Sequence, residues 1–406
     1  MKRYDLLTPE GTRDLLFDEC VALRAADAKL RGIFLSRGYT EAVTPGLEFY
    51  DVFSSKSRYF SQEEMYKLTD AKGRLMVMRP DSTMPIARLV GTRLREEVFP
   101  LKLFYSQTIY RVNPKNSGRD DEFFQSGIEI IGGDVRRSDL EALSVAIDVM
   151  AAFEAEDYRF EIGDSAFFAI LSSQLGLSEE QLDEVRTLVQ NKNYCELSEC
   201  LSVHCGNPYA TALAQLPKLF GGREVFDEAE KILPDENTKF VLKRLRELYD
   251  NLCALGAGER VTVDLGMVSR NEDYYTGVVF KGYAAGYGMP VLTGGRYDKL
   301  ISDFGVDMPA TGFAVNVNAV ARLIMNNAQG RLTKLPDVVV FAGEDSLVEG
   351  MLHCRELISD GLTADHADFK TLDEAKAYAE ERGIQRLDVV SGGDVTILNL
   401  SDGKEE

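Results

Sequence analysis

Residues 110–129, YRVNPKNSGRDDEFFQSGIE, read as the ends of two strands with a polar loop between them. The flanking runs 101–110 and 123–131 have the apolar, aromatic and β-branched content of a sheet. Because side chains alternate between the faces of a strand, Gln125 and Glu129 share one face, and Arg111 belongs to the partner strand. The segment therefore predicts a hairpin that gathers polar groups, although a solvated hairpin with a salt bridge is the more ordinary reading of these residues alone.

Upstream of the hairpin, residues 18–36 repeat apolar side chains at helical spacing and predict an amphipathic helix. A short extended run follows at 39–43, and residues 75–78 read as a further strand. Directly after that strand, the carboxylate of Asp81 and the hydroxyl of Thr83 project together, a pairing that suits an ammonium group. A helix N-terminus capped by one of these side chains is the more ordinary explanation.

Downstream of the hairpin, Ser-Asp-Leu-Glu at 138–141 matches a capping box and predicts that a helix begins there. The stretch from about 165 to 258 is rich in helical patterns and poor in β-branched runs, so we interpret it as a helical insertion. Strand character returns at 261–265 and 277–280.

Two further clusters follow the insertion. Arg270, Tyr274 and Tyr275 offer stacking and hydrogen bonds to a small polar ring, although tyrosines at the start of a strand are equally ordinary. Glycines at 294–295 and at Gly312 allow a close approach of the backbone, which is a weak signal by itself.

The end of the chain predicts a separate small domain. Residues 326–336 are rich in polar and turn residues and predict a linker. Residues 337–406 then alternate strand and helix patterns, with a capping box at 371–374 opening a helix. This order predicts a small α/β domain.

Composition excludes several classes of function. The chain has 406 residues, of which 66 are acidic and 46 basic, and its formal net charge of -20 disfavours a nucleic acid partner. No apolar run reaches the roughly 18 residues of a membrane-spanning helix, and no signal peptide is evident, so we expect no membrane and a cytoplasmic protein. Cys195, Cys200 and Cys205 are too widely spaced for a zinc knuckle, so we expect no metal and interpret them as buried thiols.

Taken in order, these clusters resemble the class II aminoacyl-tRNA synthetase core, and in detail its histidyl-tRNA synthetase branch. Residues 38–45 look like motif 1, which forms the dimer interface in that family. Arg111 and the loop through Arg119 look like motif 2, residues 312–314 look like the opening of motif 3, and 273–277 are similar to a histidine-recognition signature.

The resemblance implies an α+β fold. Residues 1–325 would form a class II synthetase-like antiparallel sheet flanked by helices and interrupted by the insertion at about 165–258. After the linker at 326–336, residues 337–406 look like a shortened anticodon-binding-like domain.

The departures from the synthetase pattern lie on the nucleotide side. Asn113 stands where the family has a glutamate that holds adenine, and Ala319 stands where it has an arginine on the nucleotide. The acidic residues 120–122 oppose a triphosphate. Because adenylation needs cations on the phosphates, we expect no catalytic residue, no cofactor and no catalysis from this chain alone.

The amino-acid side of the pocket persists. The resemblance implies a histidine site made of Asp81, Thr83, Arg111, Gln125, Glu129, Arg270, Tyr274 and Tyr275. Asp81 and Glu129 would hold the ammonium group, Arg270 the carboxylate, and Gln125 with the tyrosines would orient the rest. Asp81 replaces the glutamate that the family has at its position.

A synthetase core with this asymmetry is similar to the regulatory subunits of ATP phosphoribosyltransferase. That resemblance implies a dimer through the motif 1 region, assembly with a short catalytic subunit into a hetero-octamer, activation of that subunit, and histidine feedback in the first step of histidine biosynthesis. Three alternatives stay open: a working histidyl-tRNA synthetase, an enzyme that adenylates another acceptor, and a scaffold without a small-molecule ligand. Pyrophosphate exchange dependent on histidine and ATP would identify the first.

Overall fold

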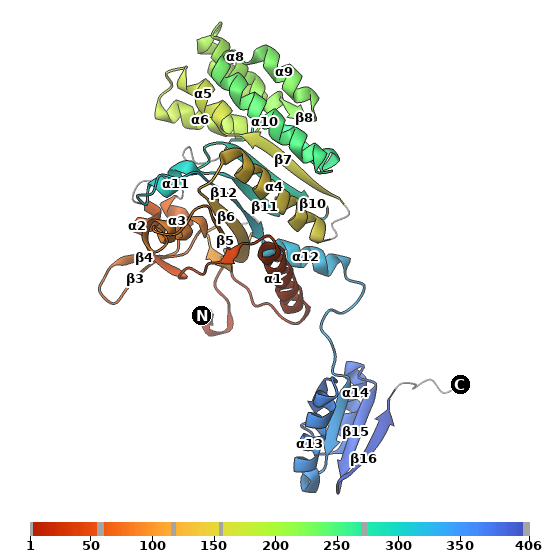
Figure 1. Cartoon of the computed structure of the whole chain (residues 1–406). Coiled ribbons are helices and arrows are strands. Elements are labelled where there is room, and N and C mark those ends of the chain that lie inside the picture. Colours follow the sequence, from red (N-terminus) through yellow and green to blue (C-terminus); the bar gives the residue numbers. More distant parts are fainter. Residues whose placement is uncertain (1–2, 55–60, 115–118, 154–156, 269–273, 401–406) are drawn as a thin grey trace. The chain divides into compact units, whose positions relative to one another are not determined.

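The computed structural model describes residues 3–54, 61–114, 119–153, 157–268 and 274–400 (Figure 1). The chain divides into two compact units, Met1–Ala328 and Gln329–Glu406, called unit 1 and unit 2 below. No helix in the described ranges is long and apolar enough to cross a lipid bilayer.

Unit 1 is built on a nine-stranded sheet with the order β1-β5-β6-β12-β11-β10-β7-β9-β8. In that order the strands are Thr40–Glu41, Leu101–Tyr110, Glu122–Ile131, Ala310–Asn316, Leu292–Arg296, Val278–Ala284, Tyr158–Asp164, Val261–Asp264 and Phe220–Gly221. From β5 to β7 every pairing is antiparallel, as predicted. At the two sides β1 runs parallel to β5 and β9 parallel to β7, so the sheet as a whole is mixed.

The predicted hairpin of β5 and β6 is confirmed, and its register sets the two faces of the sheet. Glu129 pairs with Leu103 and Gln125 with Gln107. Phe104 points to the opposite face from its neighbours and packs against Phe34, with ring centroids 5.7 Å apart. Each face of the hairpin thus serves a different layer of helices.

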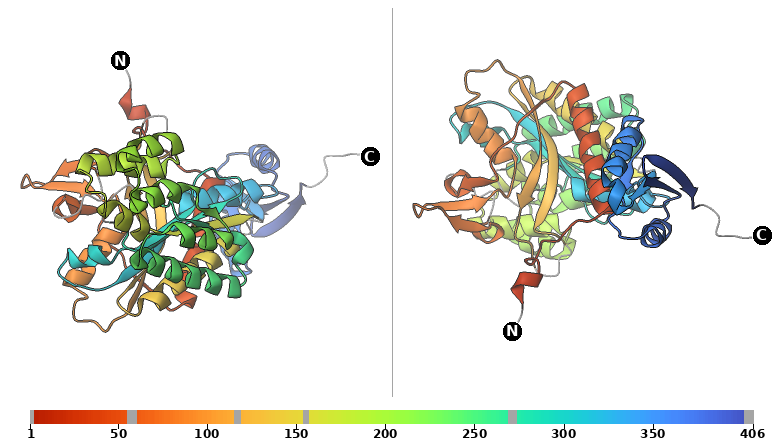
Figure 2. Two further views of the ribbon diagram at one scale, coloured as in Figure 1. Left: turned by 90° about the horizontal axis from the view of Figure 1, so that it is seen from above. Right: turned by 90° about the horizontal axis from the view of Figure 1, so that it is seen from below.

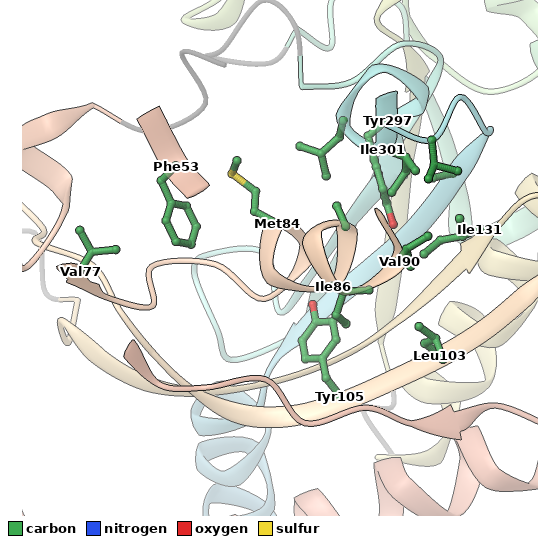
Figure 3. Packing of buried hydrophobic residues seen from close by; sticks show 14 of the residues in the cluster. Phe53, Val77, Met84, Ile86, Val90, Leu103, Tyr105, Ile131, Tyr297 and Ile301 are labelled. Carbon is green, nitrogen blue, oxygen red and sulfur yellow. The ribbon is translucent and has the colours of Figure 1, made fainter. Parts of the chain in front are cut away.

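Helices cover both faces of this sheet. The helices α1 (Asp18–Ser36), α4 (Val135–Ala152) and α12 (Val317–Asn327) pack on one face. On the other face lie α3 (Thr83–Thr92) and α11 (Asp298–Ser302). Figure 3 shows Ile86 and Val90 of α3 among Tyr105, Ile131 and Ile301, all buried. This apolar core between α3 and the sheet fixes the start of α3, where Asp81 and Thr83 lie.

A small three-stranded sheet precedes α3. It consists of β2 (Leu47–Phe49), β4 (Leu75–Met78) and β3 (Lys67–Thr69), with the short helix α2 (Asp51–Ser54) after β2. The strand β4 leads directly into α3, as the sequence predicts.

The insertion is helical, as predicted. Between β7 and β9 it holds α5 (Ala166–Ser173), α6 (Glu179–Gln190), α7 (Tyr194–Cys200), α8 (Pro208–Gln215), α9 (Glu224–Ile232) and α10 (Glu236–Ala254). Figure 2 shows these helices, coloured yellow-green to green, in front when unit 1 is seen from above, whereas α1, in red, is in front when it is seen from below. The interpretation of the cysteines as buried thiols is wrong for Cys195 and Cys205, which are exposed on this insertion.

The predicted start of α4 is wrong. The helix begins at Val135, and the side chain of Asp134 caps it by accepting a hydrogen bond from the backbone N–H of Arg137. Ser138 and Asp139 lie inside the helix and are buried. The two competing caps, Asp134 and Ser138, are four residues apart. Glu141, the other member of the predicted capping box, instead accepts a hydrogen bond from Nζ of Lys102 at 2.6 Å.

Unit 2 has three layers. Its sheet has the order β14-β13-β15-β16, with strands Ala364–His366, Val338–Ala342, Arg386–Ser391 and Asp394–Asn399. The helix α13 (Leu347–Ser359) packs on one face and α14 (Leu372–Arg382) on the other, because alternate residues of β13 join separate cores. The capping box predicted at Thr371 is confirmed. Helix α12 continues to Asn327, so the first residues of the predicted linker are helical.

Candidate functional site

The predicted ligand-binding residues of unit 1 gather around one cavity of about 190 Å³. Those that line it are Asp81, Thr83, Arg111, Gln125, Glu129, Tyr274 and Tyr275. Arg270 lies outside the described residues. The hairpin, the start of α3 and the segment before β10 are far apart in sequence and meet here, which the alternation of side chains along β6 anticipates for Gln125 and Glu129.

Glu129 lies deep in the cavity and is 1% exposed. Thr83 donates its hydroxyl to Oε1 at 2.7 Å, and Tyr297 donates its hydroxyl to Oε2. Gly312 is the cross-strand neighbour on β12, and a Cβ there would lie 2.1 Å from Oε2, so only glycine leaves room for this carboxylate. Burial raises the pKa of Glu129 to about 8, against the lowering effect of its two hydrogen bonds.

Asp81 both stabilises the first turn of α3 and lines the cavity. One carboxylate oxygen accepts a hydrogen bond from the backbone N–H of Met84 at 3.0 Å, in the first turn of α3. The other lies 3.4 Å from Nη2 of Arg111, whose Nε donates to the carbonyl of Pro80 at 2.7 Å. Burial raises the pKa of Asp81, and the Arg111 guanidinium opposes that shift. The helix-end explanation and the ligand explanation of Asp81 are therefore compatible.

Gln125 supplies an unsatisfied acceptor. It is 7% exposed, and its Oε1 has no hydrogen-bond partner among the described residues. A buried acceptor left in this state costs about 1 to 3 kcal/mol. A bound molecule that donates a hydrogen bond to this amide oxygen would remove that cost.

Tyrosine side chains form one wall of the cavity. The rings of Tyr274 and Tyr275 lie edge to face, with centroids 4.7 Å apart and an interplanar angle of 81°. Tyr275 lies against Gly295, where a Cβ would come within 2.7 Å of its ring. Tyr297, which the sequence reasoning did not single out, completes the wall. Its place beside the glycine pair at 294–295 was the available signal.

A second cavity of about 260 Å³ adjoins the first on the side where the resemblance places the nucleotide. Its lining includes Asn113, Arg119, Asp120 and Arg322, and it shares Arg111, Gln125, Thr293 and Ala314 with the first cavity. We call it the nucleotide-side cleft. Ala319 does not reach it, because this residue is 1% exposed within α12.

The charge in this cleft differs from the prediction in two respects. Of the three acids at 120–122, Asp120 alone lines the cleft. Asp121 accepts hydrogen bonds from the hydroxyl of Tyr66 at 2.5 Å and from the backbone N–H of Asn113 at 2.9 Å, and Glu122 accepts one from Tyr110. Arg322, which the sequence reasoning missed, lies one turn beyond Ala319 and 3.8 Å from Asp120.

Comparison with known proteins identifies the family. Residues 11–320 match the family model described as histidyl-tRNA synthetase. A relative from Clostridium acetobutylicum, named ATP phosphoribosyltransferase regulatory subunit, is 38% identical over 390 residues that cover 95% of each chain. The chain belongs to the family of ATP phosphoribosyltransferase regulatory subunits.

Further similar proteins match over almost the whole chain. One from Clostridium kluyveri is 36% identical over 392 residues, covering 96% of this chain and all of the relative. A crystal structure from Bacillus halodurans, of "an ATP phosphoribosyltransferase regulatory subunit/histidyl-tRNA synthetase", superposes with a TM-score of 0.83 and 28% identity and covers 94% of this chain and 97% of that one. Membership among regulatory subunits is consistent with a non-catalytic role.

Proposed function

We propose that this chain is the histidine-sensing activator of a short-form ATP phosphoribosyltransferase catalytic subunit, with which it forms a hetero-octamer in the first step of histidine biosynthesis. The observation that carries the histidine site is the unsatisfied Oε1 of Gln125 beside two buried carboxylates. An ammonium group has three donors and no acceptor. It can satisfy Gln125, Asp81 and Glu129 at once, which no neutral ligand group does as well.

The charges around the cavity match an amino-acid zwitterion. The carboxylates of Asp81 and Glu129 attract the ammonium group, and the Arg111 guanidinium at the shared wall with the cleft attracts the carboxylate. Arg270 would add a second cation there, by resemblance. The hydroxyls and ring faces of Tyr274 and Tyr275 provide the stacking and hydrogen bonds that an imidazole ring uses.

The nucleotide-side cleft explains why we expect binding without adenylation. Asp120 partly neutralises Arg322, and it also lies 3.4 Å from Nε of Arg13. The buried Ala319 supplies no cation. A triphosphate in this cleft would therefore lack the arginine that motif 3 supplies in the synthetases, by resemblance, and would meet the negative charge of Asp120 beside Arg322.

Exposed apolar side chains near the start of the chain offer a surface for self-association. Val43, in the region that resembles motif 1, and Leu47 and Phe49, on the strand β2 that follows it, are 73%, 45% and 42% exposed. Exposed apolar side chains clustered in this way are typical of protein interfaces. We propose that they contribute to a dimer, so that L47E together with F49E shifts the chain to a monomer in light scattering. Unchanged mass in that variant would exclude this surface.

The function is tested by mixing the chain with a short-form catalytic subunit and following phosphoribosyl transfer. We expect co-purification, a gain in rate on mixing, and a loss of rate when histidine is added. A coupling of about 1 to 3 kcal/mol between the two sites, or roughly 5- to 150-fold in affinity, is enough for such regulation. No gain in rate on mixing would exclude the proposed function.

A matched pair of variants separates activation from feedback. The E129Q variant should still activate the partner but respond to histidine only at much higher concentration, since it lacks one carboxylate of the cavity. The D120N variant changes a carboxylate of the neighbouring cleft and should keep the wild-type response. A wild-type histidine response in E129Q would place the histidine site elsewhere.

A further inference from the structure

The two helices of unit 2 pack on one sheet but differ in their exposed residues. All exposed residues of α14 are charged except Ala377, as expected of a surface helix. Helix α13 instead exposes large apolar side chains. They form an apolar stripe, whose members are each between 49% and 70% exposed: Leu347, Val348, Met351, Leu352 and Ile358. None of the roles proposed above uses this stripe.

Helix α13 is apolar on more sides than its own unit covers. Cys354 and Leu357 are buried in the core that α13 forms with the sheet, and Gly350 lies against Ala342 of β13. The apolar stripe lies outside that core, at the helical spacings of four and seven residues that place side chains next to one another. A helix with apolar residues on several sides is typically buried on several sides. A contiguous apolar surface of this kind marks an interaction site.

Carboxylates border the apolar stripe. Residues 343–360, which comprise α13 and the turn before it, contain five acidic residues and one basic residue, Arg355. Glu349 precedes Leu352 by three residues and Glu356 follows it by four, so both exposed carboxylates are neighbours of Leu352 on the helix surface. A second copy of this chain would bring the same excess of acids to the contact, and a nucleic acid or an anionic membrane would also be repelled. The charges therefore favour a basic partner.

We propose that the apolar stripe is a docking surface for an amphipathic helix of another protein, one that carries lysine or arginine beside its apolar face. The apolar residues of that helix pack on Met351 and Leu352, and its cations lie against Glu349 and Glu356. The stripe extends from Leu347 to Ile358, about 17 Å along the helix axis, so a partner helix of about 12 residues covers it. This proposal does not depend on the histidine site.

The test uses the full chain and two labelled peptides, built from four repeats of Leu-Lys-Lys-Leu or of Leu-Glu-Glu-Leu. Fluorescence anisotropy at about 150 mM salt should show saturable binding of the lysine peptide, with a dissociation constant on the order of 10 µM. The glutamate peptide should bind at least about tenfold more weakly. No saturable binding of the lysine peptide up to about 500 µM, or equal binding of the two peptides, would overturn the proposal.

A pair of double variants locates the bound peptide. M351E with L352E replaces two exposed apolar residues of the stripe, whereas V203E with L255E makes the same change at exposed apolar residues of the insertion. Both variants add the same negative charge, which by itself strengthens attraction of the lysine peptide. We expect the first variant to abolish binding and the second to keep it. Wild-type affinity in M351E with L352E would overturn the assignment.

A second pair tests the carboxylates that border the stripe. E349Q with E356Q should weaken the lysine peptide severalfold, whereas E380Q with E381Q, on the exposed side of α14, should not. Equal weakening in both variants would show that the overall charge attracts the peptide and would overturn the proposal. Light scattering should give M351E with L352E the mass of the wild type. A lower mass would show that a second copy covers the stripe, which would also overturn it.

Discussion

The cavity around Glu129, which we propose binds an amino acid and call the amino-acid cavity, shares a wall with the nucleotide-side cleft but differs from it in its acidic groups. In the cavity, buried carboxylates and the amide oxygen of Gln125 converge on an enclosed space, and that oxygen is left for a ligand. In the cleft, Asp120 lies near Arg322, and the amide of Asn113 donates to the carbonyl of Asp120 at 3.0 Å. The cavity thus gathers two buried carboxylates, whereas the one described acid that lines the cleft lies beside an arginine.

On our proposal, this difference is how a synthetase-like core loses chemistry and keeps recognition. Recognition of an amino acid depends on buried groups fixed by the sheet, such as Glu129 held by Thr83 and Tyr297. Adenylation depends on cations that must face the phosphates. Ala319 on α12 supplies none, and Arg322 lies near Asp120, whereas the buried groups of the cavity are held by the sheet and by α3.

The largest expected effect tests whether the cleft can be restored by one residue. A319R forces a guanidinium into a position that is 1% exposed, and overpacking together with a buried charge should cost about 3 kcal/mol or more of unfolding free energy. Urea denaturation measures it, with N326R on the exposed side of α12 as the control. A stable A319R chain that forms histidyl-adenylate would show that the cleft is still a working nucleotide site.

The next effect tests the amino-acid cavity itself. At about pH 8.5, where the carboxylate is ionised, E129Q should weaken histidine about a hundredfold, because a charged hydrogen-bond acceptor is lost from a buried site. Calorimetry measures the change. A difference of less than about threefold would mean that Glu129 does not contact the ammonium group.

A smaller effect follows from protonation. The pKa of Glu129 in the empty cavity is about 8, so below that pH the group is mostly protonated and must lose its proton to hold a cation. The ratio of wild-type to E129Q affinity should therefore rise with pH, by at most about tenfold per unit, and level off above about pH 8. A ratio that is flat between about pH 6 and 8 would contradict this role of the carboxylate.

The smallest effect concerns the ion pair of the cleft. Arg322 is exposed and lies 3.8 Å from Asp120, so R322A should change stability by no more than about 0.5 kcal/mol. It should also leave histidine affinity within about twofold of wild type. A large loss of histidine binding in R322A would mean that the two regions are not functionally separate.

The sequence predicted the parts of the fold that depend on local periodicity. The hairpin of β5 and β6 follows from alternation of side chains, and the order of the motifs brings together Asp81, Gln125 and Glu129. The directions of the side chains at 120–122 could not be predicted, because loop residues have no fixed period. Asp121 accepts a hydrogen bond from Tyr66, a residue distant in sequence. The start of α4 was missed because the capping box needs Glu141, which instead binds Lys102, a residue distant in sequence.

The central claim is that the enclosed carboxylates and Gln125 still hold a free amino acid. Its most direct test is a calorimetric titration of the purified chain with L-histidine, alone and with the catalytic subunit. We predict saturable binding at one site per chain that is strongly weakened by E129Q. Absence of binding heat up to millimolar histidine in both samples would contradict it.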